Sequence, residues 1–181
     1  MTHRSFAAYR RHRQPPYWLL PLFLLIIFYC TPPESESALD LSANAPTDHV
    51  RVFLIAPEDG GALGRKVGCS DSAVAVEVVL PKPRPALEGS LEALFSLESR
   101  YHGASGLYNP LYASPLEIEA IQREGSEARI RLGGYVELGG DCDGPRMLAQ
   151  LTETALQFPD VQRVTFFLGN KPLRQLLADR K

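Results

Sequence analysis

The stretch LGGDCDGPRMLAQLTETALQFPDVQRVTFFLGNKPL, residues 138–173, predicts a loop, a helix and a strand in direct succession. Pro145 suits the first turn of a helix because its ring fixes φ near the helical value. Asp143 precedes it, and we expect its carboxylate to cap the helix by accepting hydrogen bonds from free amides. The apolar positions that share one helical face are Leu148, Leu151 and Ala155. After Phe158–Pro159, alternating apolar residues in 161–169 predict the final strand.

The elements upstream complete an α+β pattern. The β-branched runs HVRVFLIAP (49–57) and SAVAVEVVLP (72–81) predict strands, the second of them ended by its proline. ALEGSLEALFSL (86–97) has leucines at helical spacing and predicts an amphipathic helix. Residues 115–132 alternate on both sides of REGSE and predict a β-hairpin. The order β-β-α-β-β-α-β therefore predicts a mainly antiparallel sheet with two helices packed on one face.

Residues 1–30 combine a basic segment with an apolar run, as an export signal or a membrane anchor does. Four arginines and no acid precede the 14 residues YWLLPLFLLIIFYC. A spanning helix needs about 20 residues, so the length favours a signal peptide over a transmembrane helix. Cys30 ends the run where a bacterial lipoprotein carries its lipid, but Phe28 and Tyr29 are larger than signal peptidase II expects. A signal peptide, a lipidated Cys30 and an uncleaved anchor all place the folded part outside the cytoplasmic membrane.

The charge distribution limits the partners of the chain. Residues 31–47, TPPESESALDLSANAPT, are rich in Pro, Ser, Glu and Ala, and predict a flexible tether before a domain at 48–181. Beyond residue 30 the chain carries 15 basic and 21 acidic side chains. Proteins that bind nucleic acids usually need a basic surface, so we expect no nucleic-acid partner.

Two cysteines lie beyond the leader, both in glycine-rich loops: Cys69 in GCSDS and Cys142 in GGDCDGPR. In an exported domain the simplest prediction is that they form a disulfide. A bridge that closes a loop of about 70 residues would stabilise the domain by roughly 4 kcal/mol. Free structural thiols remain an alternative.

Metal binding and thiol chemistry are two further alternatives. Asp71, Asp141 and Asp143 lie beside the cysteines in sequence, but the chain has no C-x-x-C or H-x-x-x-H spacing of zinc ligands. A nucleophilic Cys142 at a helix N-terminus would have a lowered pKa. It also needs a base, and the histidines form no recognisable partner pattern. No P-loop, G-x-S-x-G or H-E-x-x-H is present, so we expect no catalytic residue, metal or cofactor.

The loop YHGASGLYNPLYAS, residues 101–114, is rich in tyrosine. Tyr101, Tyr108 and Tyr112 could present aromatic rings to a sugar, a peptide or a partner surface. In the alternative, the loop folds onto the core through contacts between residues four apart. The residues in those contacts are Leu107, Tyr108, Leu111 and Tyr112.

Three stretches together resemble the GerMN domain, the sporulation and spore-germination module. They are GRKVGCSDSAVAVE (64–77), GLYNPLYAS (106–114) and residues 138–173, of which LTETALQFPDVQRV is the most specific. The resemblance covers about residues 50–178. It implies a small exported α+β domain, often anchored to the membrane, that serves binding or assembly. The family brings no established catalytic residue.

We therefore expect an extracytoplasmic, membrane-tethered module that binds envelope proteins, with peptidoglycan nearby, as a homo- or hetero-oligomer. The sequence departs from the spore protein in having one copy of the domain instead of two. The first alternative is a cell-wall hydrolase or thiol-dependent envelope enzyme that uses Cys142 with Asp141 and Asp143. A second alternative, suggested by the tyrosine loop alone, is a carrier of a small ligand.

Overall fold

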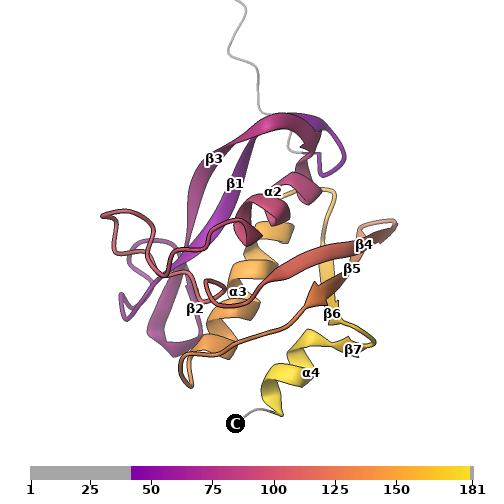
Figure 1. Cartoon of the computed structure of the whole chain (residues 1–181). Coiled ribbons are helices and arrows are strands. Elements are labelled where there is room, and N and C mark those ends of the chain that lie inside the picture. The colour runs from indigo at the N-terminus through magenta and orange to yellow at the C-terminus, as the bar shows by residue number, and fades with distance from the viewer. Residues whose placement is uncertain (1–41, 180–181) are drawn as a thin grey trace, which may run out of the picture. The chain divides into compact units, whose positions relative to one another are not determined.

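The computed structural model describes residues 42–179 (Figure 1). The predicted leader, Cys30 and most of the predicted tether lie outside these residues. The strands are β1 (Pro46–Ala56), β2 (Arg65–Val67), β3 (Asp71–Pro85), β4 (Leu116–Glu124), β5 (Glu127–Gly134), β6 (Arg163–Leu168) and β7 (Lys171–Pro172). The helices are α2 (Ala86–Phe95), α3 (Asp143–Leu156) and α4 (Leu173–Ala178), with a 3-10 turn, η3 (Gly68–Ser70). Within 42–179, no helix has the length and apolar character needed to cross a membrane.

The strands form two sheets, where the sequence predicted one. The first sheet has the order β1-β3-β2 and is antiparallel, and the second has the order β4-β5-β6-β7. In the second sheet β5 and β6 are parallel, while the other pairs are antiparallel. The chain leaves β5, passes through α3 and returns as β6, and such a helical crossover produces a parallel pair. The α+β class is therefore observed, but the single sheet was wrong, and β2 and β7 add to the predicted order. The helix α4 lies in NKPLRQLL (170–177), for which the sequence predicts a closing helical turn.

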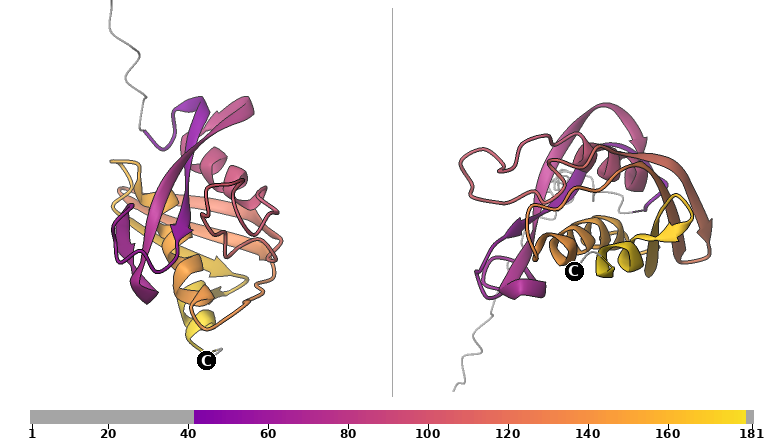
Figure 2. Two further views of the ribbon diagram at one scale, coloured as in Figure 1. Left: turned by 90° about the vertical axis from the view of Figure 1, so that its left-hand side faces the viewer. Right: turned by 60° about the horizontal axis from the view of Figure 1, so that its bottom comes forward.

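The helices α2 and α3 do not simply cover one face of one sheet. Both contact β1 and each other, while α2 also contacts β4 and α3 also contacts β6 (Figure 2). Each helix thus touches both sheets, and one core is shared by all of these elements. The fully buried core side chains include Val52, Leu54, Leu91, Leu94, Ile130, Leu132, Met147 and Leu151.

Strand β3 continues through its prolines, although Pro81 was expected to end it. It runs on to Pro85 and pairs with β1, with a register shift between Thr47 and His49. Its other neighbour, β2, pairs only with Asp71–Ala73 in the described part of the chain. A proline is tolerated on such an open edge because its missing N–H has no strand to pair with.

The folded unit begins before Asp48, the predicted boundary. Ala43 is 1% exposed, and its amide donates to the carboxylate of Asp160 at 3.0 Å. The carbonyls of Ala45 and Ala43 accept from the first amides of α2, those of Ala86 and Leu87. Free amides at a helix start need such acceptors, and no side chain among residues 42–179 supplies one to α2. This segment is therefore part of the domain.

Candidate functional site

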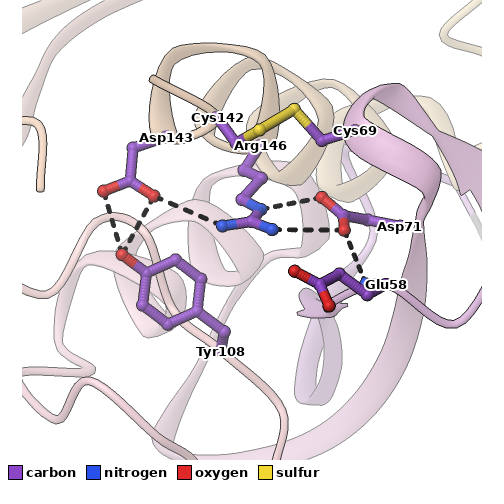
Figure 3. Close-up of a disulfide and its surroundings, with 7 residues drawn as sticks. All are labelled: Glu58, Cys69, Asp71, Tyr108, Cys142, Asp143 and Arg146. Carbon is purple, nitrogen blue, oxygen red and sulfur yellow. Dashed lines mark hydrogen bonds and ion pairs between the residues drawn. A yellow bond between two sulfur atoms is a disulfide. The ribbon is translucent and has the colours of Figure 1, made fainter. Parts of the chain in front are cut away.

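A disulfide joins Cys69 and Cys142, as the sequence predicted (Figure 3). The two cysteines are 73 residues apart in sequence, and their Cα atoms are 6.1 Å apart. Cys69 lies in η3, just before β3, and Cys142 is the residue that precedes α3. The bond therefore fixes the start of a strand of the first sheet to the start of α3. The nucleophile alternative requires Cys142 to be a free thiol, but in this structure its sulfur is bonded to that of Cys69.

Arg146, in the first turns of α3, binds Asp71 at the start of β3. Its Nε donates to Asp71 Oδ2 at 2.7 Å, and a second guanidinium nitrogen donates to Oδ1 at 3.2 Å. The carboxylate is fully buried, and it also accepts from the amide of Glu58 at 2.8 Å. The hydrogen bond to Asp71 raises the pKa of Arg146, although burial opposes the shift. A paired arrangement of this kind compensates the cost of burying a carboxylate.

Asp143 extends the chain of contacts to the tyrosine loop. Its oxygens accept from the hydroxyl of Tyr108 at 2.9 and 3.0 Å and from the amide of Gly139 at 2.7 Å. Arg146 lies 3.8 Å from the same carboxylate. The predicted role of Asp143 as helix cap was wrong: it is the first residue of α3, Cys142 precedes it, and no side chain in the described part of the chain caps the helix. The tertiary partner Tyr108 holds the carboxylate instead.

We call Asp71, Arg146, Asp143 and Tyr108 the ion network. Burial and the hydrogen bond to Asp143 raise the pKa of Tyr108 to about 12, so at neutral pH its hydroxyl is a donor. In the order Asp71, Arg146, Asp143 and Tyr108, each member contacts the next, so that Arg146 lies between the two carboxylates (Figure 3). Asp141, a candidate in the metal and enzyme alternatives, is exposed and lies outside the network. Within 42–179, no three His, Cys, Asp or Glu residues are grouped to hold a metal ion.

The three tyrosines of the predicted binding loop have different environments. Tyr108 is buried and pairs with Ile55 at the end of β1 through two backbone hydrogen bonds of 2.9 and 2.7 Å. Tyr112 is half-buried, whereas Tyr101 is 51% exposed. For Tyr108 the alternative of packing against the core was therefore right. Tyr101 is the aromatic ring of the three that is available at the surface.

Arg100, which was not predicted from the sequence, contacts the rings of all three tyrosines. Its guanidinium carbon lies 5.8, 5.6 and 5.7 Å from the ring centroids of Tyr101, Tyr108 and Tyr112. Such distances are typical of cation–π contacts. The rings come from positions 1, 8 and 12 residues after the arginine, so the only signal in the sequence was an arginine beside a tyrosine-rich loop.

A cleft of about 200 Å³ lies between this loop and the ion network. Its lining includes Glu58, Arg100, Tyr101, Tyr108, Gly140 and Arg146. Three members of the ion network, Tyr108, Asp143 and Arg146, line the cleft, and Pro57 and Glu58 line it from the turn after β1. We call this space the Arg100 cleft.

Fold and site together define a small α+β module stapled by a disulfide and a buried ion network. No protein-family model matches the chain, and no curated protein matches it. Among solved structures, the tandem GerMN domains of the sporulation protein GerM from Bacillus subtilis are similar, with 15% sequence identity and a TM-score of 0.44. The match covers 76% of this chain and 43% of that one, so this chain spans less than half of the tandem structure. GerMN is also the family that the sequence motifs resemble.

Proposed function

We propose that this chain is an extracytoplasmic binding module of the bacterial cell envelope, held at the membrane by its N-terminal segment. The observation that carries the proposal is the disulfide between Cys69 and Cys142, because such bonds form and persist in oxidising compartments. The basic and apolar composition of residues 1–30 supports the same location. The GerMN-like motifs add sporulation or cell-wall metabolism as the setting.

The proposed role is binding and assembly rather than catalysis. The side chains that were candidates for catalysis hold the fold together. Cys69 and Cys142 form a disulfide, and Asp71 and Asp143 are bonded to Arg146 and Tyr108. At the surface, the tyrosine loop presents an arginine and an exposed tyrosine, two residue types that are enriched at energetically important points of protein interfaces. We therefore propose this loop as the surface that contacts envelope proteins.

Thiol trapping in cells tests the location. The full chain, with its N-terminal segment, is expressed in a bacterial host and treated with an alkylating reagent before or after reduction. We expect the peptides of Cys69 and Cys142 to be alkylated only after reduction, and protease added to spheroplasts to degrade the domain. Free thiols in untreated cells, or protection from the protease, would exclude the extracytoplasmic location. The mass of the Cys30 peptide reports in the same experiment whether this residue is lipidated.

Site-specific crosslinking tests the binding surface. A photoreactive residue at Tyr101 is compared with one at Glu124, the exposed last residue of β4. The loop between α2 and β4 and the hairpin end of β4 and β5 lie at opposite sides of the molecule in Figure 1. We expect an identified envelope protein to crosslink at 101, to be absent at 124, and to be lost with Arg100→Glu. Equal capture at the two positions would exclude the loop, and wall-hydrolase activity that requires Cys142 would establish the enzyme alternative.

A further inference from the structure

Two opposite charges line the Arg100 cleft without a hydrogen-bond or ion-pair partner in the described part of the chain. Arg100 and Glu58 both face this space of about 200 Å³. Within 42–179, neither the guanidinium of Arg100 nor the carboxylate of Glu58 makes a hydrogen bond or an ion pair with another residue. By contrast, Asp143 and Arg146 line the same cleft and belong to the bonded network. The cleft thus offers one positive and one negative group to a ligand.

Arg100 is held in place although its donors are free. The rings of three tyrosines surround its guanidinium, and its carbonyl accepts from the amide of Asn109 at 2.9 Å. Tyr101 and Tyr108 also form an antiparallel backbone bridge. A guanidinium that is already ordered loses less conformational entropy when it binds a carboxylate.

Glu58 occupies a backbone conformation that glutamate rarely adopts. Its φ is +56°, in the left-handed region, and its amide donates to Asp71 of the ion network. At such a position any residue other than glycine is destabilising, because its Cβ atom lies too close to the backbone. Strain of this kind is common at binding sites, where the surrounding structure enforces it. Glu58 keeps a carboxylate at the cleft where glycine would fit the backbone better.

We propose that the Arg100 cleft binds a small zwitterion, a free amino acid or a dipeptide. Its carboxylate binds Arg100, its ammonium binds Glu58, and its apolar side chain packs against the exposed ring of Tyr101. A ligand with both charges satisfies both unpaired groups, whereas a simple anion is repelled by Glu58 and a simple cation by Arg100. The inference rests on the proposed binding role of this loop and adds the chemical class of a ligand. We call Glu58, Arg100 and Tyr101 the cleft rim.

Two zwitterions and two analogues that each lack one charge test this assignment. The full oxidised chain is titrated with leucine, alanyl-leucine, N-acetylleucine and leucine amide, and the amide resonances of Tyr101 and Gly140 are followed by NMR. We expect leucine or the dipeptide to bind at least ten-fold more tightly than the two analogues that lack one charge. The ratio of leucine to dipeptide affinity tells which of the two ligands the cleft prefers.

Two variants assign the charges to their partners. In Arg100→Gln, leucine and leucine amide should bind equally, because the group that recognises the carboxylate is gone. In Glu58→Gln, leucine and N-acetylleucine should bind equally, because the acceptor of the ammonium is gone. Glu124→Gln removes an exposed carboxylate elsewhere and should leave all four affinities unchanged.

Several results would overturn the inference. They are absence of shifts with every probe, equal binding of all four, and binding of N-acetylleucine as tight as that of leucine. The last result would define a site for carboxylates alone. The proposed envelope location is tested separately, since export and the oxidation of the cysteines do not depend on the rim charges.

Discussion

The ion network and the cleft rim are neighbours, yet they carry charge in opposite ways. In the network the charged groups are largely buried and each is bonded to the next, and the adjacent disulfide holds the elements that bear them. In the rim the side chains are exposed, and within 42–179 their two charges have no hydrogen-bond or ion-pair partner. This difference indicates a division of roles: the network fixes the shape of the cleft, and the rim is left for a ligand. Substitutions in the network should therefore change stability, and those in the rim should change binding.

Removing the disulfide should give the largest loss of stability. In Cys69→Ser/Cys142→Ser the unfolded chain regains the freedom that a link across 73 residues removes, which corresponds to about 4 kcal/mol. Urea unfolding of the double variant and of the oxidised wild type measures this difference. The reduced wild type is the control, and it should unfold near the midpoint of the double variant. Equal midpoints for oxidised and reduced protein would show that the network holds the two elements without the staple.

Breaking the buried ion pair should have the next largest effect. Asp71→Asn leaves Arg146, whose side chain is 16% exposed, without its bidentate partner, and we expect a loss of about 3 kcal/mol in the free energy of unfolding. The matched control is Glu119→Gln, which removes a 3.5 Å pair with Arg131 between half-exposed side chains. That change should cost less than about 1 kcal/mol. Similar losses for both variants would remove the distinction between a buried network and an ordinary surface pair.

Tyr108→Phe removes the last bond of the network without creating a large cavity. Asp143 loses a hydroxyl donor to its buried carboxylate, so we expect a loss of about 1.5 kcal/mol at pH 7. Tyr101→Phe is the control, because its ring is 51% exposed and the change should leave the free energy of unfolding nearly unaltered. Chemical denaturation of the three proteins at pH 7 provides the comparison.

Alkaline pH provides a second test of the same hydroxyl. The pKa of Tyr108 is raised to about 12 in the folded protein, whereas an unfolded tyrosine loses its proton near pH 10. The stabilising contribution of Tyr108 is therefore complete below pH 10 and is lost as the pH rises toward 12. The difference in stability between wild type and Tyr108→Phe should shrink over this interval. A constant difference from pH 8 to 12 would contradict the raised pKa.

The parts of the fold that follow local rules were predictable from sequence. Pro145 and the apolar spacing after it predicted α3, and the alternation in residues 115–132 predicted the hairpin of β4 and β5. The disulfide followed from the expectation of export together with two cysteines in glycine-rich loops. Each of these inferences needs only neighbouring residues or the compartment.

The remaining features depend on contacts between distant segments. Alternation in β6 shows which face is buried, but it does not reveal that β5 is its parallel neighbour. Arg146 and Asp71 are 75 residues apart, and nothing in either local sequence identifies the other as its partner. Asp143 followed the local rule for a helix cap in sequence, but in the fold Tyr108 provides a competing donor. The sequence thus identified Asp143 as a hydrogen-bond acceptor, but it predicted helix amides as the donors where the structure has the Tyr108 hydroxyl.

The smallest expected change, at Glu58, separates the two roles most directly. Glu58→Gly relieves the left-handed φ of +56°, whereas Glu58→Ala removes the carboxylate and keeps the strain. We expect the glycine variant to be about 1 kcal/mol more stable than the alanine variant in urea unfolding, and both to lose the preference for leucine over N-acetylleucine. If glycine gave no gain over alanine, the rim would not be strained. If either variant kept the preference, the carboxylate of Glu58 would not be the group that recognises the ammonium. Glu58→Gly should therefore gain stability and lose its preference for the ligand in the same step. Binding needs a carboxylate at position 58, whereas the backbone there favours glycine.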